Sequence, residues 1–457
     1  MTIINKIIII NAALIIAELS AVMATDIDTV FNAMFRRDIG GWVAADATFS
    51  IYLPDGRTLW LFGDTFIGEA ESDGSIAPGV VMIRNSAVIQ DGDSLRTLYR
   101  GTPAAPDDFI PTANPDSTWY WPEHGIVFND TLRIFVARYR TNPEGPAGFQ
   151  FEFDGNDIAN FTWPGLEFIN SISIPYYPVN EVIYGDRILA DSIYLYIYGR
   201  KEENKDYNIA YPHLARAKAD SLLNAWEFYN GSGWTKDTAA SFRINSFQVS
   251  QQYGVFKHQG KYVLLTQDIW FSTKIWSFTS TSPAGPWSNK TLVYDTPKLA
   301  DDAFTYNAYP HPQFDENNKL LVSYNNNGDF WEIFSNADLY RPVFIRVPYA
   351  QLDPAFGPGT GIDIGLPASD LIELSVNYPN PFISNTTVNY RVKKKEFVEL
   401  VIYDVSGRIV ASYVNRTLDP GEYSLMINCG DFDDGVYFCR MTGSLSEARP
   451  MIKISSY

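Results

Sequence analysis

The chain has 457 residues, a formal net charge of −18, 46% hydrophobic residues and 15% aromatic residues. This length accommodates more than one domain, and an acidic chain is not expected to bind nucleic acid, whose phosphates attract basic surfaces. The many Tyr, Phe and Trp residues favour β-strands and suit surfaces that bind sugars.

Residues 1–24 predict a secretory signal peptide. Lys6 supplies a basic residue, an apolar core interrupted by Asn11 follows over residues 7–16, and residues 22–24 form a small-residue cleavage site. The apolar run is too short for a confident membrane span, and no later segment has 18 uninterrupted apolar residues. We therefore expect a protein that is secreted or held on the outer cell surface, with no stable membrane span.

Residues 25–350 contain a repeated hairpin pattern. A polar turn followed by alternating bulky residues recurs roughly every 60–75 residues, starting at Pro54, Asn129, Ala190, His258 and Glu316. Such a repeat in a chain with few helical stretches indicates β-propeller blades. The sequence therefore predicts an all-β fold with a five-bladed β-propeller, in which one helix-like stretch, residues 215–226, is short enough to be a loop excursion.

A second domain is expected after the propeller. Gly and Pro residues from Asp353 onward predict a linker over residues 351–370. Residues 371–457 then alternate short strands with turns, which favours a small immunoglobulin-like β-sandwich. The only two cysteines, Cys429 and Cys439, fall in this domain, and the sequence leaves their pairing open.

Short motifs in the second domain carry a resemblance to a known family. They are Asn377-Tyr-Pro-Asn-Pro-Phe382, Ile402-Tyr-Asp-Val-Ser-Gly407 and Gly435-Val-Tyr-Phe438. This combination resembles the C-terminal sorting domain of the bacterial type IX secretion system. The resemblance implies export across the outer membrane with the secretion machinery as a partner; the alternative is an ordinary accessory sandwich.

Polar residues precede each repeated hairpin at comparable positions. They are Asp46, Glu123, Asn180 with Glu181, Ser250 to Gln252, and Tyr306 with Asn307. Strands buried between blades should be mostly apolar, so polar groups here predict a ring at the mouth of the propeller channel. Carboxylates, amides and aromatic residues around one axis suit a cleft that processes sugars.

Asp64 adds a carboxylate on the strand that returns toward Asp46. A two-residue turn would place Asp64 opposite Ala47, whereas a three-residue turn containing Gly56 would place both acids on one face, either directly opposed or diagonal. Neighbouring carboxylates push their pKa values apart, so that one stays ionised and the other holds a proton. We expect Asp46 and Asp64 to be the central catalytic pair, with Glu123 and Glu181 as further candidates for the general acid.

Further side chains around this ring are candidates for substrate binding. They are Trp42, Arg84, Asn85, Trp121, Asn180, Gln251, Tyr306, Asn307, His311 and Asn325. Four histidines make a His-rich metal cluster improbable, and no cofactor is expected. A structural Ca²⁺ in the channel, bound by oxygen ligands such as Asn307 or Asp268, stays open.

Motifs around the same positions carry a second resemblance. They include Gly40-Gly-Trp-Val-Ala-Ala-Asp46, Leu59-Trp-Leu-Phe-Gly-Asp-Thr65, Ser282-Pro-Ala-Gly-Pro-Trp287 and Tyr340-Arg-Pro342. They resemble five-bladed propeller families related to glycoside hydrolases, in particular a group first described as domains of unknown function that includes endo-acting D-arabinanases. The resemblance implies carboxylates from successive blades. Asp46 fits the expected place in blade one, and Glu123 and Glu181 fit the next two only loosely.

The sequence thus predicts a secreted glycoside hydrolase acting on a polysaccharide, with arabinofuranose-containing polymers among the candidates. A non-catalytic carbohydrate-binding propeller is the first alternative, and it needs no two carboxylates within catalytic reach of each other. A surface adhesion or scaffold propeller is the second, and it predicts a flat, apolar mouth.

Overall fold

The structure is a computed structural model. It describes residues 25–36, 41–145, 150–191, 193–204, 209–218, 221–268, 272–300, 303–356, 362–363, 373–374, 377, 379–380, 382–392, 395–404, 408–430, 432–442 and 446–454. The predicted signal peptide therefore lies outside the described residues. The chain divides into two compact units, residues 1–365 and 366–457. None of the helices within the described ranges is long and apolar enough to cross a membrane.

All five predicted turns join antiparallel strands, which confirms the repeated hairpins. The hairpins are β3 (Phe49–Tyr52) with β4 (Thr58–Phe62), β11 (Thr118–Phe128) with β12 (Thr131–Thr141), β15 (Val182–Ala190) with β16 (Tyr194–Asn204), β20 (Tyr253–His258) with β21 (Lys261–Gln267), and β24 (Phe304–Glu316) with β25 (Lys319–Asn327). Turn residues with positive φ, such as Asn129 and Asp130, allow these tight reversals.

Further strands extend each hairpin into an antiparallel sheet. They are β7 (Ser86–Asp91) and β8 (Ser94–Leu98); β13 (Phe151–Thr162) and β14 (Phe168–Ser173); β17 (Ile209–Lys218), β18 (Trp226–Tyr229) and β19 (Trp234–Thr235); β22 (Lys274–Ser280), β23 (Ser288–Asp295) and β27 (Ile362–Asp363); and β26 (Pro342–Pro348) with β1 (Asp26–Ile27). Smaller sheets contain β2 (Trp42–Ala45), β5 (Thr65–Ile67) and β6 (Val81–Ile83), and β9 (Arg100–Thr102) with β10 (Ala105–Asp107).

The five sheets pack on one another in chain order, and the last packs on the first. Separate apolar clusters join the first sheet to the second, the second to the third, the third to the fourth, and the fourth to the fifth. A further cluster joins the first sheet, through Trp60 and Phe62, to the fifth, through Leu321 and Phe344. The first strands of the sheets follow the same cyclic order of contacts.

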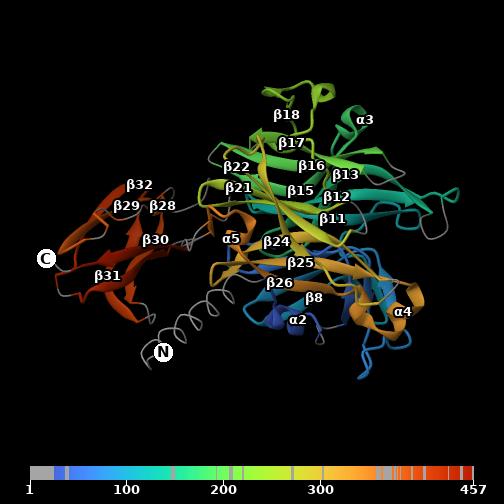
Figure 1. Ribbon diagram of the computed structural model, residues 1–457, viewed down its shortest axis with the longest axis horizontal. Coiled ribbons are helices and arrows are strands. Elements are labelled where there is room, and N and C mark those ends of the chain that lie inside the picture. Colours follow the sequence, from blue (N-terminus) through green and yellow to red (C-terminus); the bar gives the residue numbers. More distant parts are fainter. Residues whose placement is uncertain are drawn as a thin grey trace, which may run out of the picture. The chain divides into compact units, whose positions relative to one another are not determined.

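The N-terminal segment completes the fifth sheet. Strand β1 pairs with β26, and the short helix α2 (Thr29–Met34) packs beside it (Figure 1). Asp28 caps this helix by accepting a hydrogen bond from the Phe31 amide, and its other carboxylate oxygen accepts one from Arg346 at 2.5 Å. Residues from the two ends of the first unit are thus held in one sheet.

The remaining helices of the described chain are short and connect strands. They are α3 (Tyr177–Asn180), α4 (Phe330–Ser335), α5 (Tyr349–Leu352) and the 3₁₀ turns η3 (Thr238–Ala240) and η4 (Ala337–Tyr340).

The second unit has two antiparallel sheets with a common apolar core. One sheet contains β28 (Glu373–Leu374), β29 (Asn385–Val392) and β32 (Gly421–Asn428); the other contains β30 (Glu396–Asp404), β31 (Ile409–Leu418), β33 (Gly435–Thr442) and β34 (Ser446–Lys453). Cys429 and Cys439 are buried in the core as free thiols. The immunoglobulin-like topology of this unit stays a prediction.

Two segments differ from their predicted local structure. Residues 215–218 and Trp226 of the helix-like stretch are extended: Ala215 pairs with Phe228, and Ala217 with Trp226, because alternate residues of this part of the third sheet are buried against the second sheet. The start of the predicted linker is packed: Asp353 accepts hydrogen bonds from Lys261 (2.8 Å) and Thr279 (3.1 Å). Residues after the last sheet thus contribute to the first unit.

Candidate functional site

Asp46 and Asp64 lie opposite each other where the first hairpin continues into a second ladder. Phe49 pairs with Leu61, and Ala45 pairs with Thr65 in the same register. This register confirms the three-residue turn, in which Gly56 has a φ of 89°. The Asp46 amide donates to the Asp64 carbonyl oxygen at 3.4 Å, so the two acids are directly opposed rather than diagonal.

The backbone between the two ladders is irregular at Ala47 and Gly63, and this irregularity leaves space for the Asp46 carboxyl group. Ala47 has a φ of 56°, and the Gly63 amide donates to the Asp46 carbonyl oxygen at 2.9 Å. A Cβ atom at Gly63 would lie 2.6 Å from Asp46 Oδ1. A side chain at this position would therefore displace the Asp46 carboxyl group.

Asp64 is held by two donors, Trp121 on β11 and Arg84 in the connection between β6 and β7. Trp121 Nε1 donates to Oδ1 at 3.0 Å, and Arg84 Nη1 donates to Oδ2 at 3.3 Å. The Arg84 guanidinium lies 4.5 Å from the centre of the Trp119 ring, a cation–π contact that orients it toward Asp64. The Asp64 side chain is 17% exposed, so solvent reaches this carboxylate.

Asp46 is held by two tyrosines from the fifth sheet and its loop. Tyr306 donates its hydroxyl to Oδ2 at 2.8 Å, and the nearby Tyr340 hydroxyl also lowers the pKa of the Asp46 carboxyl group. Asn327 Nδ2 donates to the Tyr306 hydroxyl at 3.5 Å, which links the end of β25 to the pair. No guanidinium contacts Asp46 among the hydrogen bonds and ion pairs of the described residues.

Burial raises the pKa of both carboxyl groups, but the two groups differ in the neighbours that oppose this rise. Burial and then the negative charge of Asp64 raise the pKa of Asp46 to about 7, although its tyrosine partners lower it. Burial also raises the pKa of Asp64, but the charge of Arg84 and the hydrogen bond from Trp121 oppose the rise. Near neutral pH, Asp46 is the member of the pair suited to hold a proton and Asp64 is the member suited to be ionised.

A second carboxylate cluster lies at bulges in the first strands of the second and third sheets. Arg200 Nη1 donates to Glu123 Oε1 at 3.2 Å and to Asp186 Oδ1 at 2.7 Å. These three side chains are at most 5% exposed. Glu123 Oε2 and Asp186 Oδ2 are buried without a hydrogen-bond partner in the described chain. Burial raises the pKa of both acids, and for Asp186 the rise is large despite the Arg200 charge.

The structure places Glu181 away from both clusters. It follows α3 with a φ of 57°, its side chain is 68% exposed, and it pairs with Lys201 at 3.0 Å. The carboxylate at the bulge of the third sheet is Asp186 instead. The sequence Tyr184-Gly-Asp-Arg187 contains a signal for it, since a glycine inside a strand pattern often marks a bulge.

Of the predicted binding residues, Arg84, Trp121 and Tyr306 contact the carboxylate pair directly. The others have partners elsewhere or are packed. Trp42 is buried in the cluster that joins the first and fifth sheets, Asn85 bonds backbone atoms, and Asn180 accepts from the Val182 amide. Gln251 donates to Glu202, His311 lies between Ser50 and Ser323, and Asn325 accepts from Thr48. Asn307 Oδ1 is buried without a partner in the described part of the chain.

Tyr340 and Asn327 were not predicted to join the site. Both lie in or beside the connection between β25 and β26, far from Asp46 in sequence. The Tyr340-Arg-Pro342 motif was the only signal for Tyr340. In the described ranges, no group of three His, Cys, Asp or Glu side chains could hold a metal ion.

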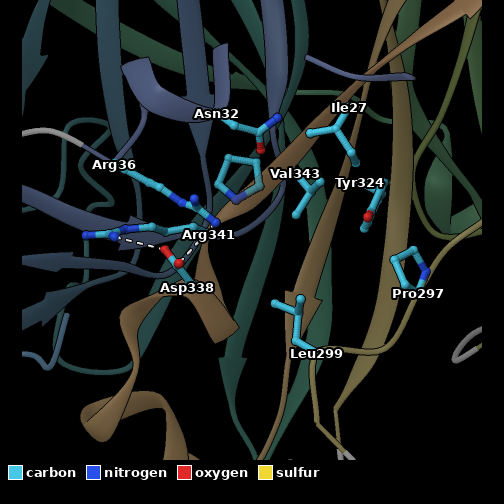
Figure 2. Close-up of a pocket in the computed structure, with 10 residues that line it drawn as sticks. Ile27, Asn32, Arg36, Pro297, Leu299, Tyr324, Asp338, Arg341 and Val343 are labelled. Carbon is cyan, nitrogen blue, oxygen red and sulfur yellow. Dashed lines mark hydrogen bonds and ion pairs between the residues drawn. The ribbon is translucent and has the colours of Figure 1, made fainter. Parts of the chain in front are cut away.

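A cavity of about 180 Å³ lies elsewhere, beside the N-terminal segment (Figure 2). Ile27, Leu299 and Val343 give it a largely apolar wall, and the ion pair of Asp338 with Arg36 (3.0 Å) lies at one side. None of the predicted site residues lines it. The carboxylate pair is therefore the stronger candidate for chemistry.

Comparisons with family models identify both units. Residues 28–362 match a domain of unknown function, DUF5005, and residues 376–453 match the secretion system C-terminal sorting domain. The first match spans most of the chain, so the chain belongs to the DUF5005 family. The second confirms the predicted sorting tail, and the protein is accordingly secreted or on the outer cell surface. A search of curated proteins gave no match.

Solved structures resemble the first unit. A candidate hydrolase from Bacteroides ovatus has a TM-score of 0.59 at 22% identity, with 71% of this chain and 90% of that chain covered. The two chains therefore share a fold. A GH43_1 enzyme from Xanthomonas citri complexed with xylose is more distant, with a TM-score of 0.40 at 14% identity and with 70% of this chain and 93% of that chain covered. A GH62 α-L-arabinofuranosidase catalytic domain from Coprinopsis cinerea has a TM-score of 0.37 at 10% identity, with 68% of this chain and 92% of that chain covered.

Proposed function

We propose that this member of the DUF5005 family is a secreted glycoside hydrolase that cleaves a polysaccharide at the Asp46–Asp64 pair. One observation supports the proposal most strongly: two opposed carboxyl groups lie in one site that solvent reaches, and they have different partners. The Tyr306 hydroxyl bonds Asp46, whereas Arg84 and Trp121 bond Asp64. The proposal includes the five cyclically packed sheets as the blades of one propeller. Arabinofuranose-containing polymers are the first substrates to test.

The pair divides the work of cleavage between a proton donor and an anion. Asp46, with its pKa near 7, gives its proton to the glycosidic oxygen as the bond to the anomeric carbon breaks. Asp64 is ionised beside Arg84, and it either attacks the anomeric carbon or takes a proton from an attacking water. The separation of the carboxyl groups with substrate bound decides which, about 5–5.5 Å for retention and about 6.5–9.5 Å for inversion.

The acid role falls to Asp46 rather than to Glu123 or Glu181 for reasons of access and charge. Glu123 is buried against Arg200, and Glu181 is exposed and paired with Lys201. A general acid needs both a raised pKa and a path to the leaving oxygen. Asp46 has the raised pKa, and it lies opposite a carboxylate that solvent reaches.

The test is the release of reducing ends from a panel of polysaccharides, arabinans included. The wild-type protein should release them from at least one polymer. Asp46→Asn and Asp64→Asn should each lower the rate by about 10²–10⁴-fold while remaining folded, because each removes a group that transfers a proton or bears charge in the transition state. Glu181→Gln is the matched control and should keep the wild-type rate.

Two results would count against the proposal. If the Asn variants cleave as fast as the wild type, the chemistry lies elsewhere. If no polymer is cleaved but glycans are retained equally by wild type and both variants, the protein is a carbohydrate-binding module and the pair has no catalytic role.

A further inference from the structure

Two large exposed aromatic side chains lie on α4, which follows β25 and its last residue Asn327. Trp331 is 76% exposed and Phe330 is 52% exposed, and their rings meet edge to face with centroids 5.6 Å apart. Large aromatic residues usually bury their rings in a core, so two adjacent exposed ones indicate a binding surface. We call Phe330 and Trp331 the α4 platform.

Two chains of contacts connect the α4 platform to Asp46. Through hydrogen bonds, Asn327, three residues before the platform, contacts Tyr306, which contacts Asp46. The second chain consists of ring contacts. The centroid of the Phe334 ring lies 5.0 Å from that of Phe330 and 5.5 Å from that of Phe66, and the Phe66 centroid lies 5.6 Å from that of Tyr340. Tyr340 in turn lies near enough to Asp46 to lower the pKa of its carboxyl group. The platform and the pair are thus parts of one packed assembly.

The platform is fixed in place rather than free to move with a loop. Asp329 caps α4 by accepting from the Trp331 amide at 2.9 Å. The Ile76 amide donates to the Phe334 carbonyl oxygen at 2.9 Å, and the Ala337 amide donates to the Gly74 carbonyl oxygen at 3.0 Å. The last two bonds fix the C-terminal end of α4 and the turn after it to the connection between β5 and β6, while the cap orders the N-terminal end. A prearranged surface binds with less loss of conformational entropy.

We infer that the α4 platform is a binding site for a neutral polysaccharide chain, on which sugar rings beyond the cleaved bond stack. The size of the surface argues against a second protein: two partly exposed rings offer roughly 300 Å², whereas a stable interface buries roughly 800 Å² per partner. Its charge argues against an anionic partner, because Asp329 and Glu332 flank the rings and α4 contains no basic residue. The inference deepens the proposed function and rests on it, because the bound polysaccharide is taken to run from the platform toward the Asp46–Asp64 pair.

The test measures retention by soluble arabinan, arabinogalactan and arabinoxylan in native gels. All proteins carry Asp46→Asn, so that the polymer stays intact. Adding Trp331→Ala should weaken binding about tenfold, the loss expected for one stacking ring, and Trp331→Phe should recover most of the affinity. The matched control is Phe397→Ala, because Phe397 is 55% exposed but lies on β30 of the second unit.

The outcomes separate this inference from the hydrolase proposal. If Trp331→Ala binds as tightly as its parent, or if none of the three polymers retains the parent, the platform inference is overturned. It is also overturned if Trp331→Ala turns a dimer into a monomer in size-exclusion chromatography. Failure of the hydrolase proposal shows differently: the wild type releases no reducing ends, while retention still depends on Trp331.

Discussion

The first unit contains two carboxylate clusters that differ in their surroundings rather than in their chemistry. Asp46 and Asp64 have separate partners, and solvent reaches Asp64; Glu123 and Asp186 share Arg200, and the Asp186 side chain is 0% exposed. Burial raises the pKa in both clusters. A raised pKa therefore does not separate a reactive site from a structural one here. Solvent access and the type of partner do.

The largest expected effect tests the structural assignment of the second cluster. Arg200→Met leaves two buried acids without their cation, and it should lower the free energy of unfolding by about 3–5 kcal/mol. Arg84→Met is the matched variant, because it removes the cation of the first pair; Asp64 is partly exposed, so its cost should stay below about 1 kcal/mol. Urea unfolding at pH 7 measures both. Equal losses would erase the distinction between the clusters.

A smaller change in the free energy of unfolding is expected when the Asp46 carboxyl group is replaced by a neutral amide. The pKa of Asp46 is about 7 in the fold against 3.8 ordinarily, so the wild type loses stability as pH rises between these values. Asp46→Asn has no such loss. It should unfold with a free energy higher than that of wild type by roughly 1–2 kcal/mol at pH 8, and the gain should shrink toward pH 4.

The same measurement on Asp55→Asn, at the exposed first turn, serves as the control. A gain for Asp46→Asn that does not change with pH would contradict the raised pKa. A pH-dependent gain, combined with lost cleavage, would mean that the wild type keeps an unfavourable carboxyl group for the sake of its reaction.

The smallest expected effect is a shift in the pH profile. The Tyr306 hydrogen bond lowers the pKa of Asp46, so Tyr306→Phe should raise it and move the alkaline limb of kcat/KM upward by about half a pH unit. The wild-type limb should lie near pH 7. Tyr349→Phe is the control, since the buried Tyr349 hydroxyl has no hydrogen-bond partner in the described chain. A downward or absent shift for Tyr306→Phe would show that Asp46 is not the titrating acid.

The repeated hairpins could be predicted because turn chemistry is local. Residues such as Gly56 and Asn129 adopt a positive φ in the turns themselves, and alternation of buried residues follows from strand geometry. The same rule tied the placement of Asp46 and Asp64 to the length of one turn, which the sequence left open between two and three residues and which the observed register settles. This part of the site is close in sequence, so the pattern reduced it to a few arrangements.

The rest of the site depends on packing between sheets, which no local pattern encodes. Counting back from the third hairpin led to Glu181, but α3 and the bulge after Tyr184 place Asp186 at the strand position instead. Tyr340 reaches Asp46 from a connection near the other end of the first unit. The start of the helix-like stretch, at Ala215, is a strand for a related reason: burial of its alternate residues against the second sheet outweighs helix propensity.

The pairing of β1 with β26 determines when, during synthesis of the chain, the fifth sheet can be completed. Asp26 and Arg346 are partners in one ladder, so ribosomal synthesis delivers one of them early and the other after most of the first unit. Contacts so distant along the chain form slowly. The sorting tail begins beyond both strands, at residue 376. Once the sorting tail has been synthesised, both strands of the β1–β26 pair are therefore already present in the chain.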